Sequence, residues 1–77
     1  MHEPDLEIDA IGLLCPLPVL RARKALAGMK AGAVLRLLAD DPAAVIDVPH
    51  FCAQAGHAFL SATTDGPVTA YLIRRGP

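Results

Sequence analysis

The amino-acid sequence predicts an α/β protein of the α+β kind, a two-layer sandwich in which a four-stranded mixed sheet carries two helices on one face. Three observations support this prediction. The chain has 77 residues, of which 53% are hydrophobic, so it can fold as one small domain over residues 1–77. Turn-forming residues divide it into short segments. The spacing of apolar residues within those segments predicts the order βαβαββ.

The first two segments are predicted to be a short strand and a helix. Residues Leu6 to Asp9 alternate apolar and acidic side chains, which is typical of a strand. Pro16 to Leu26 should be helical, because Pro18 suits a first helical turn, where a missing N–H costs little. Gly28 is a typical helix stop. Apolar residues at helical spacing should face the core, namely Val19, Ala22, Leu26 and Met29.

The second helix is predicted within "DDPAAVIDVPHFCAQAG". Asp41 is a natural N-cap and Pro42 a natural first helical residue, so Asp40, Asp41 and Pro42 are most simply a helix cap. Pro49 interrupts the pattern, and we expect a kink or a new start near Asp47. Gly56 should end the helix. The apolar stripe that should pack on the core consists of Val48, Phe51, Cys52 and Ala55.

The remaining segments are predicted strands. Ala33 to Ala39 is the first of them, with Leu35 and Leu37 on one face and Val34, Arg36 and Leu38 on the other. His57 to Thr63 and Val68 to Arg74 follow, and the Asp65-Gly66 pair between them is a strong hairpin signal. Val34, Leu38 and Tyr71 could form an apolar patch on the sheet face without helices, but scattered surface apolarity is the favoured explanation of these residues.

Composition and charge exclude several functions. Seven Lys and Arg stand against eight Asp and Glu, for a formal net charge of -1, which disfavours direct nucleic-acid binding. The start, "MHEPDLEIDA", lacks a basic region followed by an apolar core, so no secretory signal is expected. The longest apolar stretch, Ala10 to Leu20, is too short and too broken to span a membrane. We therefore expect a cytoplasmic protein with two reduced thiols.

The stretch "GLLCPLPVL" gives Cys15 an unusual setting, between an apolar run and two prolines. Pro16 fixes the direction in which the chain leaves the cysteine, and Pro18 starts the helix after Leu17. This arrangement predicts a rigid, exposed thiol at a helix N-terminus, where free N–H groups and the helix dipole favour a thiolate and lower its pKa. The alternative is that Cys15 is a small apolar residue packed under a loop.

The second cysteine, Cys52, lies on the apolar stripe of the second helix, and core packing is its simplest role. "CPLP" is not "CxxC", so no neighbouring thiol can resolve a mixed disulfide, which argues against a dithiol oxidoreductase. The chain ends in "RRGP" rather than the Gly-Gly of ubiquitin-like sulfur carriers. Sulfur that arrives on Cys15 should therefore stay there until another protein takes it.

Three stretches carry a resemblance to a known family: "LEIDAIGLLCPLPVLRARKAL", "LLADDPAAVIDVPHFCAQAGH" and the closing hairpin. From about Leu6 to Arg74, the sequence resembles the TusA family of SirA-like sulfur carriers, whose CPxP motif is here Cys15-Pro16-Leu17-Pro18. The resemblance implies a βαβαββ sandwich and a sulfurtransferase that accepts sulfane sulfur as a persulfide on Cys15. It implies a carrier that relays this sulfur to an acceptor protein, rather than an independent turnover enzyme.

The resemblance also implies partners. The sulfur donor would be a cysteine desulfurase or a rhodanese. The acceptor would be a Tus-type or Dsr-type protein or a component of the molybdenum-cofactor pathway, which links the family to tRNA thiolation, cofactor synthesis and sulfur oxidation. Members of the tRNA pathway carry an acidic residue where this chain has Leu17. The expected oligomeric state is a monomer that self-associates weakly at most.

Three cations follow the motif, and they have two readings. Arg21, Arg23 and Lys24 form either the solvated face of a helix or a positive rim that docks an acidic partner and steadies the persulfide anion. No metal and no cofactor are expected, since the histidines His2, His50 and His57 do not share one helical turn. The alternative function is a non-catalytic protein- or RNA-interaction or regulatory module in which Cys15 is structural.

Overall fold

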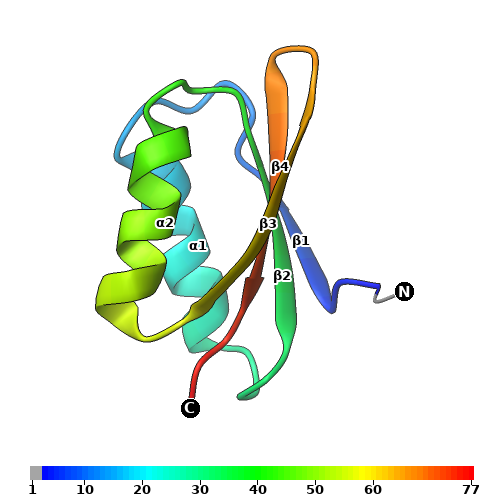
Figure 1. Ribbon diagram of the computed structural model, residues 1–77, viewed down its shortest axis with the longest axis vertical. Coiled ribbons are helices and arrows are strands. Elements are labelled where there is room, and N and C mark those ends of the chain that lie inside the picture. The colour runs from blue at the N-terminus through cyan, green and yellow to red at the C-terminus, as the bar shows by residue number, and fades with distance from the viewer. Residues whose placement is uncertain (1–2) are drawn as a thin grey trace.

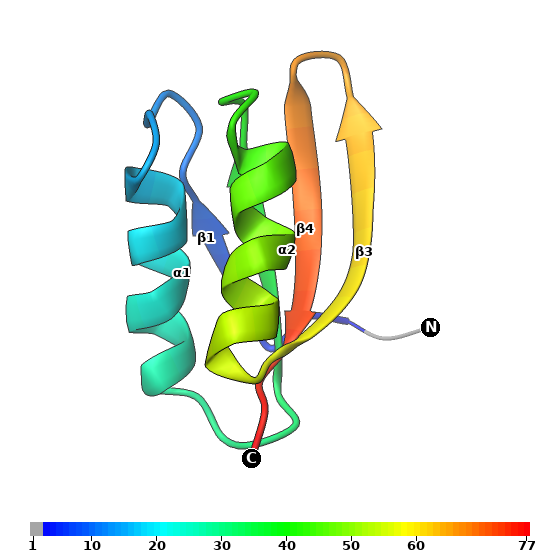
Figure 2. The ribbon, with the colours of Figure 1, turned by 60° about the vertical axis from the view of Figure 1, so that its left-hand side comes forward.

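The structure is a computed structural model that describes residues 3–77. Along the chain it contains β1 (Leu6–Asp9), α1 (Leu17–Ala27), β2 (Val34–Ala39), α2 (Ala44–Ala55), β3 (Ala58–Asp65) and β4 (Val68–Arg74). The two helices lie side by side on one face of the sheet, and the other face is open (Figures 1 and 2). The predicted two-layer α/β sandwich with the order βαβαββ is therefore confirmed.

The sheet is mixed, with the strand order β1-β2-β4-β3. Strands β1 and β2 pair in parallel, whereas β2 with β4 and β3 with β4 pair antiparallel. The parallel pair is joined by α1, as a parallel connection requires a crossover. Because β1 and β2 run in the same direction, the loops that follow them emerge at the same end of the molecule (Figure 1).

The core lies between the helices and the sheet. The register places Leu35 opposite Ile73 and Leu37 opposite Tyr71 on the face that the helices cover. The helices contribute apolar side chains at helical spacing, and the fully buried members of the core include Ala22, Leu26, Val48 and Cys52. Val19 and Met29 are half-buried against this cluster. The faces expected of α1 and β2 are thus the observed ones. On the second helix Val48, Phe51 and Cys52 pack on the core as expected, but Ala55 is exposed, because it lies in the last turn, beyond the part of the helix that the sheet covers.

The sheet face expected for Tyr71 was wrong. Its exposed fraction is 1%, and its register with Leu37 puts it on the helix side of the sheet. Strand β4 is apolar on both faces, so alternation alone could not assign its direction. By alternation from Leu35 and Leu37, Val34 and Leu38 do lie on the open face, where Arg36 donates to Glu7 over 3.2 Å in an ion pair.

Helix α2 differs from its prediction in two respects. It begins at Ala44 rather than at Pro42, because Asp41 and the residues after it form a turn in which the Ala44 N–H donates to the Asp41 carbonyl. It then runs without interruption through Pro49. Proline removes one helical hydrogen bond there, and the burial of the apolar stripe on the core outweighs that loss. Gly56 ends the helix with a φ of 80°, as expected.

The hairpin between β3 and β4 has the expected position. Asp65 pairs with Val68, so Gly66 and Pro67 form a two-residue connection. Gly66 has a φ of 59° and occupies the first central position, where the tight turn needs a positive φ. Strand β3 extends to Asp65, beyond the expected Thr63, and the register shifts between Phe59 and Ser61.

The segment after β4 packs back onto the domain. The Arg75 side chain donates through Nε to the Leu26 carbonyl over 3.0 Å, near the end of α1. The Gly76 N–H donates to Nδ1 of His57 over 2.9 Å. A Cβ atom added at Gly76 would overlap the carbonyl oxygen of Gly56, so this close approach requires glycine. This tail lies at the end of the molecule opposite the loop that carries Cys15 (Figure 1).

Candidate functional site

The loop that carries Cys15 is held by the acidic pair that follows β2. The Gly12 N–H donates to Oδ1 of Asp40 over 2.9 Å, and the Cys15 N–H donates to Oδ2 of Asp41 over 2.6 Å. The parallel pairing of β1 and β2 brings these two loops together. Asp41 also accepts a hydrogen bond from the Ala43 N–H over 3.3 Å, which lies in the turn before α2. The expectation that Asp41 is the N-cap was wrong, because the helix begins after Ala43 and has no side-chain cap.

The two prolines of the motif have different environments. Pro18 is fully buried, whereas Pro16 precedes α1 and lines the groove described below. Leu17, between them, is 46% exposed. The first helical turn offers the sulfur few donors, because both prolines lack an N–H and the Leu17 N–H donates to the Leu14 carbonyl over 2.8 Å. The expected stabilisation of a thiolate by this helix is therefore weak.

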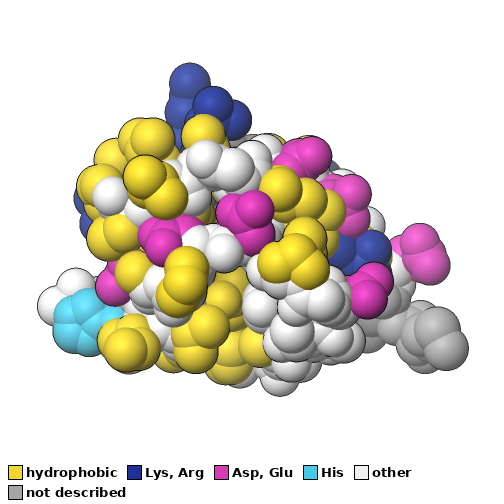
Figure 3. All heavy atoms as spheres, turned by 90° about the horizontal axis from the view of Figure 1, so that it is seen from above, with side chains coloured by type: hydrophobic (Ala, Val, Ile, Leu, Met, Phe, Trp, Pro, Cys, Tyr) yellow, Lys and Arg dark blue, Asp and Glu magenta, His cyan; other side chains and the backbone are white. Residues whose placement is uncertain are grey.

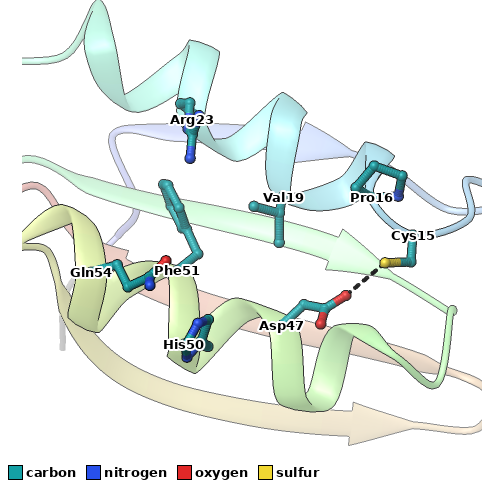
Figure 4. A pocket seen from close by; sticks show the side chains of 8 residues that line it. All are labelled: Cys15, Pro16, Val19, Arg23, Asp47, His50, Phe51 and Gln54. Carbon is teal, nitrogen blue, oxygen red and sulfur yellow. Dashed lines mark hydrogen bonds between the residues drawn. The ribbon is translucent and has the colours of Figure 1, made fainter.

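The Cys15 side chain instead faces a carboxylate on the second helix. Its Sγ donates to Oδ2 of Asp47 over 2.9 Å (Figure 4). This hydrogen bond raises the pKa of the Cys15 thiol, and loss of hydration and the negative charges of Asp47 and Asp41 act in the same direction. The expectation that the pKa of Cys15 lies below that of a free cysteine was thus wrong.

A groove between the two helices begins at this thiol (Figure 4). Its volume is about 220 Å³. One helix contributes residues four apart and the other contributes residues three or four apart, so each wall is a single helical stripe. The lining residues are Cys15, Pro16, Val19 and Arg23 on the α1 side and Asp47, His50, Phe51 and Gln54 on the α2 side.

The structure separates the three predicted cations. Arg23 lies in the groove with Cys15, and its guanidinium carbon stands 5.6 Å from the centre of the Phe51 ring. Arg21 and Lys24 line a different depression, together with Leu6, Ile8 and Ala25. Only one of the three cations therefore shares a surface with the thiol.

The end of the molecule around Cys15 is apolar and acidic rather than basic (Figure 3). Leu14 and Ile46 are 70% and 74% exposed, although both are large aliphatic residues. The other exposed aliphatic side chains of the loop and of the first turns of the helices are Ile11, Leu17, Leu20 and Val45. Such a concentration is uncommon on a surface that faces only water.

The second cysteine has the role that its position predicts. Cys52 is 1% exposed and belongs to the core cluster. Burial raises the pKa of its thiol, which makes it a poor nucleophile. Both cysteines are free thiols, and only Cys15 is exposed.

The remaining sequence-based expectations concern metals and membranes. Within residues 3–77, no three His, Cys, Asp or Glu side chains are grouped so that they could hold a metal ion, and His2 lies outside the described residues. In the same part of the chain, the helices are too short or too polar to cross a lipid bilayer.

Sequence reasoning missed three carboxylates of the site. Asp47 contacts the sulfur, and Asp40 and Asp41 hold the loop backbone. Each is separated from its partner by 26 to 32 positions in the sequence. One signal was available: an acidic pair directly after a strand that pairs in parallel with the strand before Cys15 must lie near the cysteine loop.

Comparison with known proteins gives consistent results. The family model described as sulfurtransferase TusA matches residues 6–75. A solved structure of a SirA-like protein from Desulfitobacterium hafniense is similar over 94% of this chain and 99% of its own, with 33% sequence identity and a TM-score of 0.65. The family acts generally in sulfur relay, between donor and acceptor proteins. The chain therefore belongs to the TusA family of SirA-like sulfurtransferases.

Proposed function

We propose that this protein accepts sulfane sulfur as a persulfide on Cys15 and relays it to an acceptor protein. The observation that carries the proposal is the contrast between its two thiols: Cys15 is exposed at the mouth of a groove, and Cys52 is sealed in the core. This thiol is exposed, lies on a loop that Asp40 and Asp41 hold in place, and has no second thiol nearby. Such a thiol suits a group that is loaded by one protein and unloaded by another.

The loading step exchanges one sulfur–sulfur bond for another. The terminal sulfur of a donor persulfide forms a bond to Sγ of Cys15, while its bond to the donor's own sulfur breaks. The donor leaves as a thiol, and Cys15 becomes a persulfide. Unloading repeats the exchange with the acceptor's thiol as the nucleophile, so the carrier returns to its starting state without any external oxidant or reductant.

The exposed aliphatic side chains around Cys15 support a protein partner. Both transfers require the partner's sulfur to approach within bonding distance of a thiol that stands on the surface. A partner that covers Leu14 and Ile46 would bury apolar area and exclude water from the exchanging sulfurs. The expected donors are a cysteine desulfurase or a rhodanese, and the expected acceptors are proteins of tRNA thiolation, molybdenum-cofactor synthesis or sulfur oxidation in the cytoplasm.

The direct test is intact mass spectrometry after loading. The wild-type protein is incubated with a cysteine desulfurase and cysteine, or with a rhodanese and thiosulfate, and then digested to locate the added sulfur. We expect one added sulfur on the Cys15 peptide and none on the Cys52 peptide. The matched variants are Cys15→Ser, which should not load, and Cys52→Ala, which should load normally. Normal loading of Cys15→Ser would contradict the proposal.

The alternative, an interaction or regulatory module with a structural Cys15, makes the opposite prediction. In that case Cys15→Ser would unfold or destabilise the protein, or would leave its cellular role intact. The exposure of Cys15 speaks against a packing role for its side chain. Complementation of a deletion strain by Cys15→Ser, alongside thermal unfolding of the same variant, distinguishes the two functions.

A further inference from the structure

We propose that Asp47 is a catalytic residue of the sulfur exchange: it holds the Cys15 thiol at rest and accepts its proton as sulfur arrives. This inference rests on the proposed persulfide carriage by Cys15. It adds the residue that activates the thiol, which the sequence motif does not contain.

The geometry is that of a proton donor and its acceptor. Cys15 Sγ lies 2.9 Å from Oδ2 of Asp47, which is within hydrogen-bonding distance for a sulfur donor. The two side chains project toward one another across the mouth of the groove, one from the loop before α1 and the other from α2 (Figure 4). A general base must lie within hydrogen-bond reach of the proton that it removes, and among residues 3–77 Asp47 is the side chain that the thiol hydrogen-bonds.

The charges around the thiol explain why a base is needed. The groups that face it are Asp47 on α2, Asp41 in the loop after β2, and His50 and Arg23 farther along the groove. The two nearest are carboxylates, and both oppose loss of the thiol proton. The thiolate is the nucleophile in sulfur exchange, so the neutral thiol must lose its proton before or during the attack.

The same charges make the exchange favourable once the proton has gone. A thiolate derived from a weakly acidic thiol is intrinsically a strong nucleophile. In the product, the negative charge moves to the terminal sulfur, which is about 2 Å beyond Sγ along the new sulfur–sulfur bond. That charge can then lie in the groove, toward His50 and Arg23 and away from Asp47 and Asp41.

The balanced step involves one proton and two sulfur–sulfur bonds. Neutral Cys15–SH reacts with a donor persulfide anion, R–S–S⁻, to give Cys15–S–S⁻ and R–SH. Asp47 takes the proton from Sγ as the new bond forms. It then releases that proton to the donor sulfur that departs, so that the net charge is conserved and Asp47 returns to its carboxylate form.

The test compares two rates in the variant Asp47→Asn. The first is alkylation of Cys15 by iodoacetamide as a function of pH, on a Cys52→Ala background, and it needs no sulfur donor. The second is single-turnover sulfur transfer from glutathione persulfide, followed by rapid quenching and intact mass. The matched control is Asp65→Asn, which removes the same charge as Asp47→Asn. The Asp65 carboxylate is exposed in the hairpin and does not act on the Cys15 thiol.

The proposal predicts that the two rates move in opposite directions. Without the Asp47 carboxylate the thiol ionises more easily, so alkylation at pH 7 should be faster than in the wild type. Sulfur transfer should be slower by about tenfold or more, because the proton acceptor is gone. The variant Asp47→Glu, which restores a carboxylate, should recover part of the transfer rate, and Asp65→Asn should change neither rate.

Three outcomes would overturn the inference. Transfer in Asp47→Asn that is as fast as in the wild type would mean that Asp47 only suppresses the thiolate. Alkylation that is unchanged or slower would mean that the carboxylate does not control the thiol proton. Equal loss of transfer in Asp47→Asn and Asp47→Glu would mean a role in local packing. Failure of the wild type to load any sulfur would remove the proposed function itself, and the donor-independent alkylation rates identify that case.

Discussion

The backbone N–H of Cys15 donates to the side chain of Asp41 over 2.6 Å, although 26 positions separate the two residues. This contact joins the loop after β1 to the loop after β2. It fixes the backbone of the cysteine itself, so the sulfur has a defined position even though its side chain is exposed. Preorganisation of this kind reduces the ordering that a partner must impose when it docks.

The first prediction concerns the hydrogen bond between the Cys15 N–H and Asp41. Asp41→Ala should leave the Cys15 N–H without its acceptor and increase its hydrogen exchange with solvent, with a loss of unfolding free energy of about 1 kcal/mol. Exchange measured residue by residue by NMR, with urea unfolding, tests both effects. Asp40→Ala is the matched variant, because it should release the Gly12 N–H and leave that of Cys15 protected. Identical exchange patterns in the two variants would contradict separate roles for the two carboxylates.

The second prediction concerns the cations. Arg23→Gln should slow sulfur transfer from a protein donor at low salt, and the difference from the wild type should shrink as salt is added, because salt screens the attraction between the charge of Arg23 and the donor. The paired variant Arg21→Gln/Lys24→Gln should have a smaller effect, since those side chains line another depression. Stopped-flow or quenched transfer at two ionic strengths measures this. A larger effect of the double variant would place the donor on the other surface.

The third prediction concerns the buried thiol. Cys52→Ala should lower the free energy of unfolding by about 1 kcal/mol or more, because it leaves a small cavity in the core beside Val48. Sulfur loading of the folded variant should equal that of the wild type. Urea unfolding together with loading measures both quantities. A stable variant that loads poorly would show that Cys52 takes part in the chemistry.

The overall fold followed from the sequence because its signals are local. Leu35 and Leu37 alternate on β2, and Ala22 and Leu26 share one face of α1, so each element carries its own periodicity. The direction of Tyr71 did not follow, since β4 has apolar residues on both faces. The site followed only in part. Cys15 is marked by its prolines, but its contacts with Asp41 and Asp47 join distant segments and depend on how the elements pack.

The acidity of Cys15 shows why a local rule failed at the site. A helix N-terminus lowers the pKa of a thiol through its free N–H groups, and the sequence places Cys15 just before a helix. The prolines that define the motif remove those donors, and a carboxylate from the other helix takes their place. The sign of the pKa shift was therefore set by a tertiary contact that no periodicity reveals.

The fourth prediction concerns the tail after β4. Gly76→Ala would force its new methyl group onto the carbonyl of Gly56, so we expect the tail to detach and the free energy of unfolding to fall by about 1–2 kcal/mol. The loss of the hydrogen bond to His57 should be visible as a shift of the imidazole signals in NMR spectra. As a control for Gly76→Ala, the variant Gly66→Ala is unsuitable because it strains a turn. The variant Ala55→Gly is the better control, because Ala55 is exposed and lies close to Gly56 in the chain. Unchanged stability and unchanged imidazole signals in Gly76→Ala would contradict the packing of the tail.

The fifth prediction concerns pH. Burial lowers the pKa of His57 in the folded protein, and the charge of Arg75 acts in the same direction. The unfolded chain therefore binds a proton at a higher pH than the folded one. The contribution of His57 to the free energy of unfolding is fully present above its unfolded pKa of about 6.5. It is lost as the pH falls through the lower pKa of His57 in the folded protein. Between pH 7.5 and 5, the unfolding midpoint of the wild type should fall by more than that of His57→Gln. Parallel pH profiles would contradict this role.

The exposure of Cys15 has a consequence for how cargo travels. The groove is open and the sulfur stands at its mouth, so residues 3–77 form no closed compartment around the persulfide that Cys15 would carry under the proposed function. Any small thiol or oxidant that collides with the loaded carrier can reach the terminal sulfur. Under the proposed function, the lifetime of the persulfide in free solution would then depend on how often such molecules collide with it. A carrier built in this way suits brief passages between abundant partners and does not suit storage.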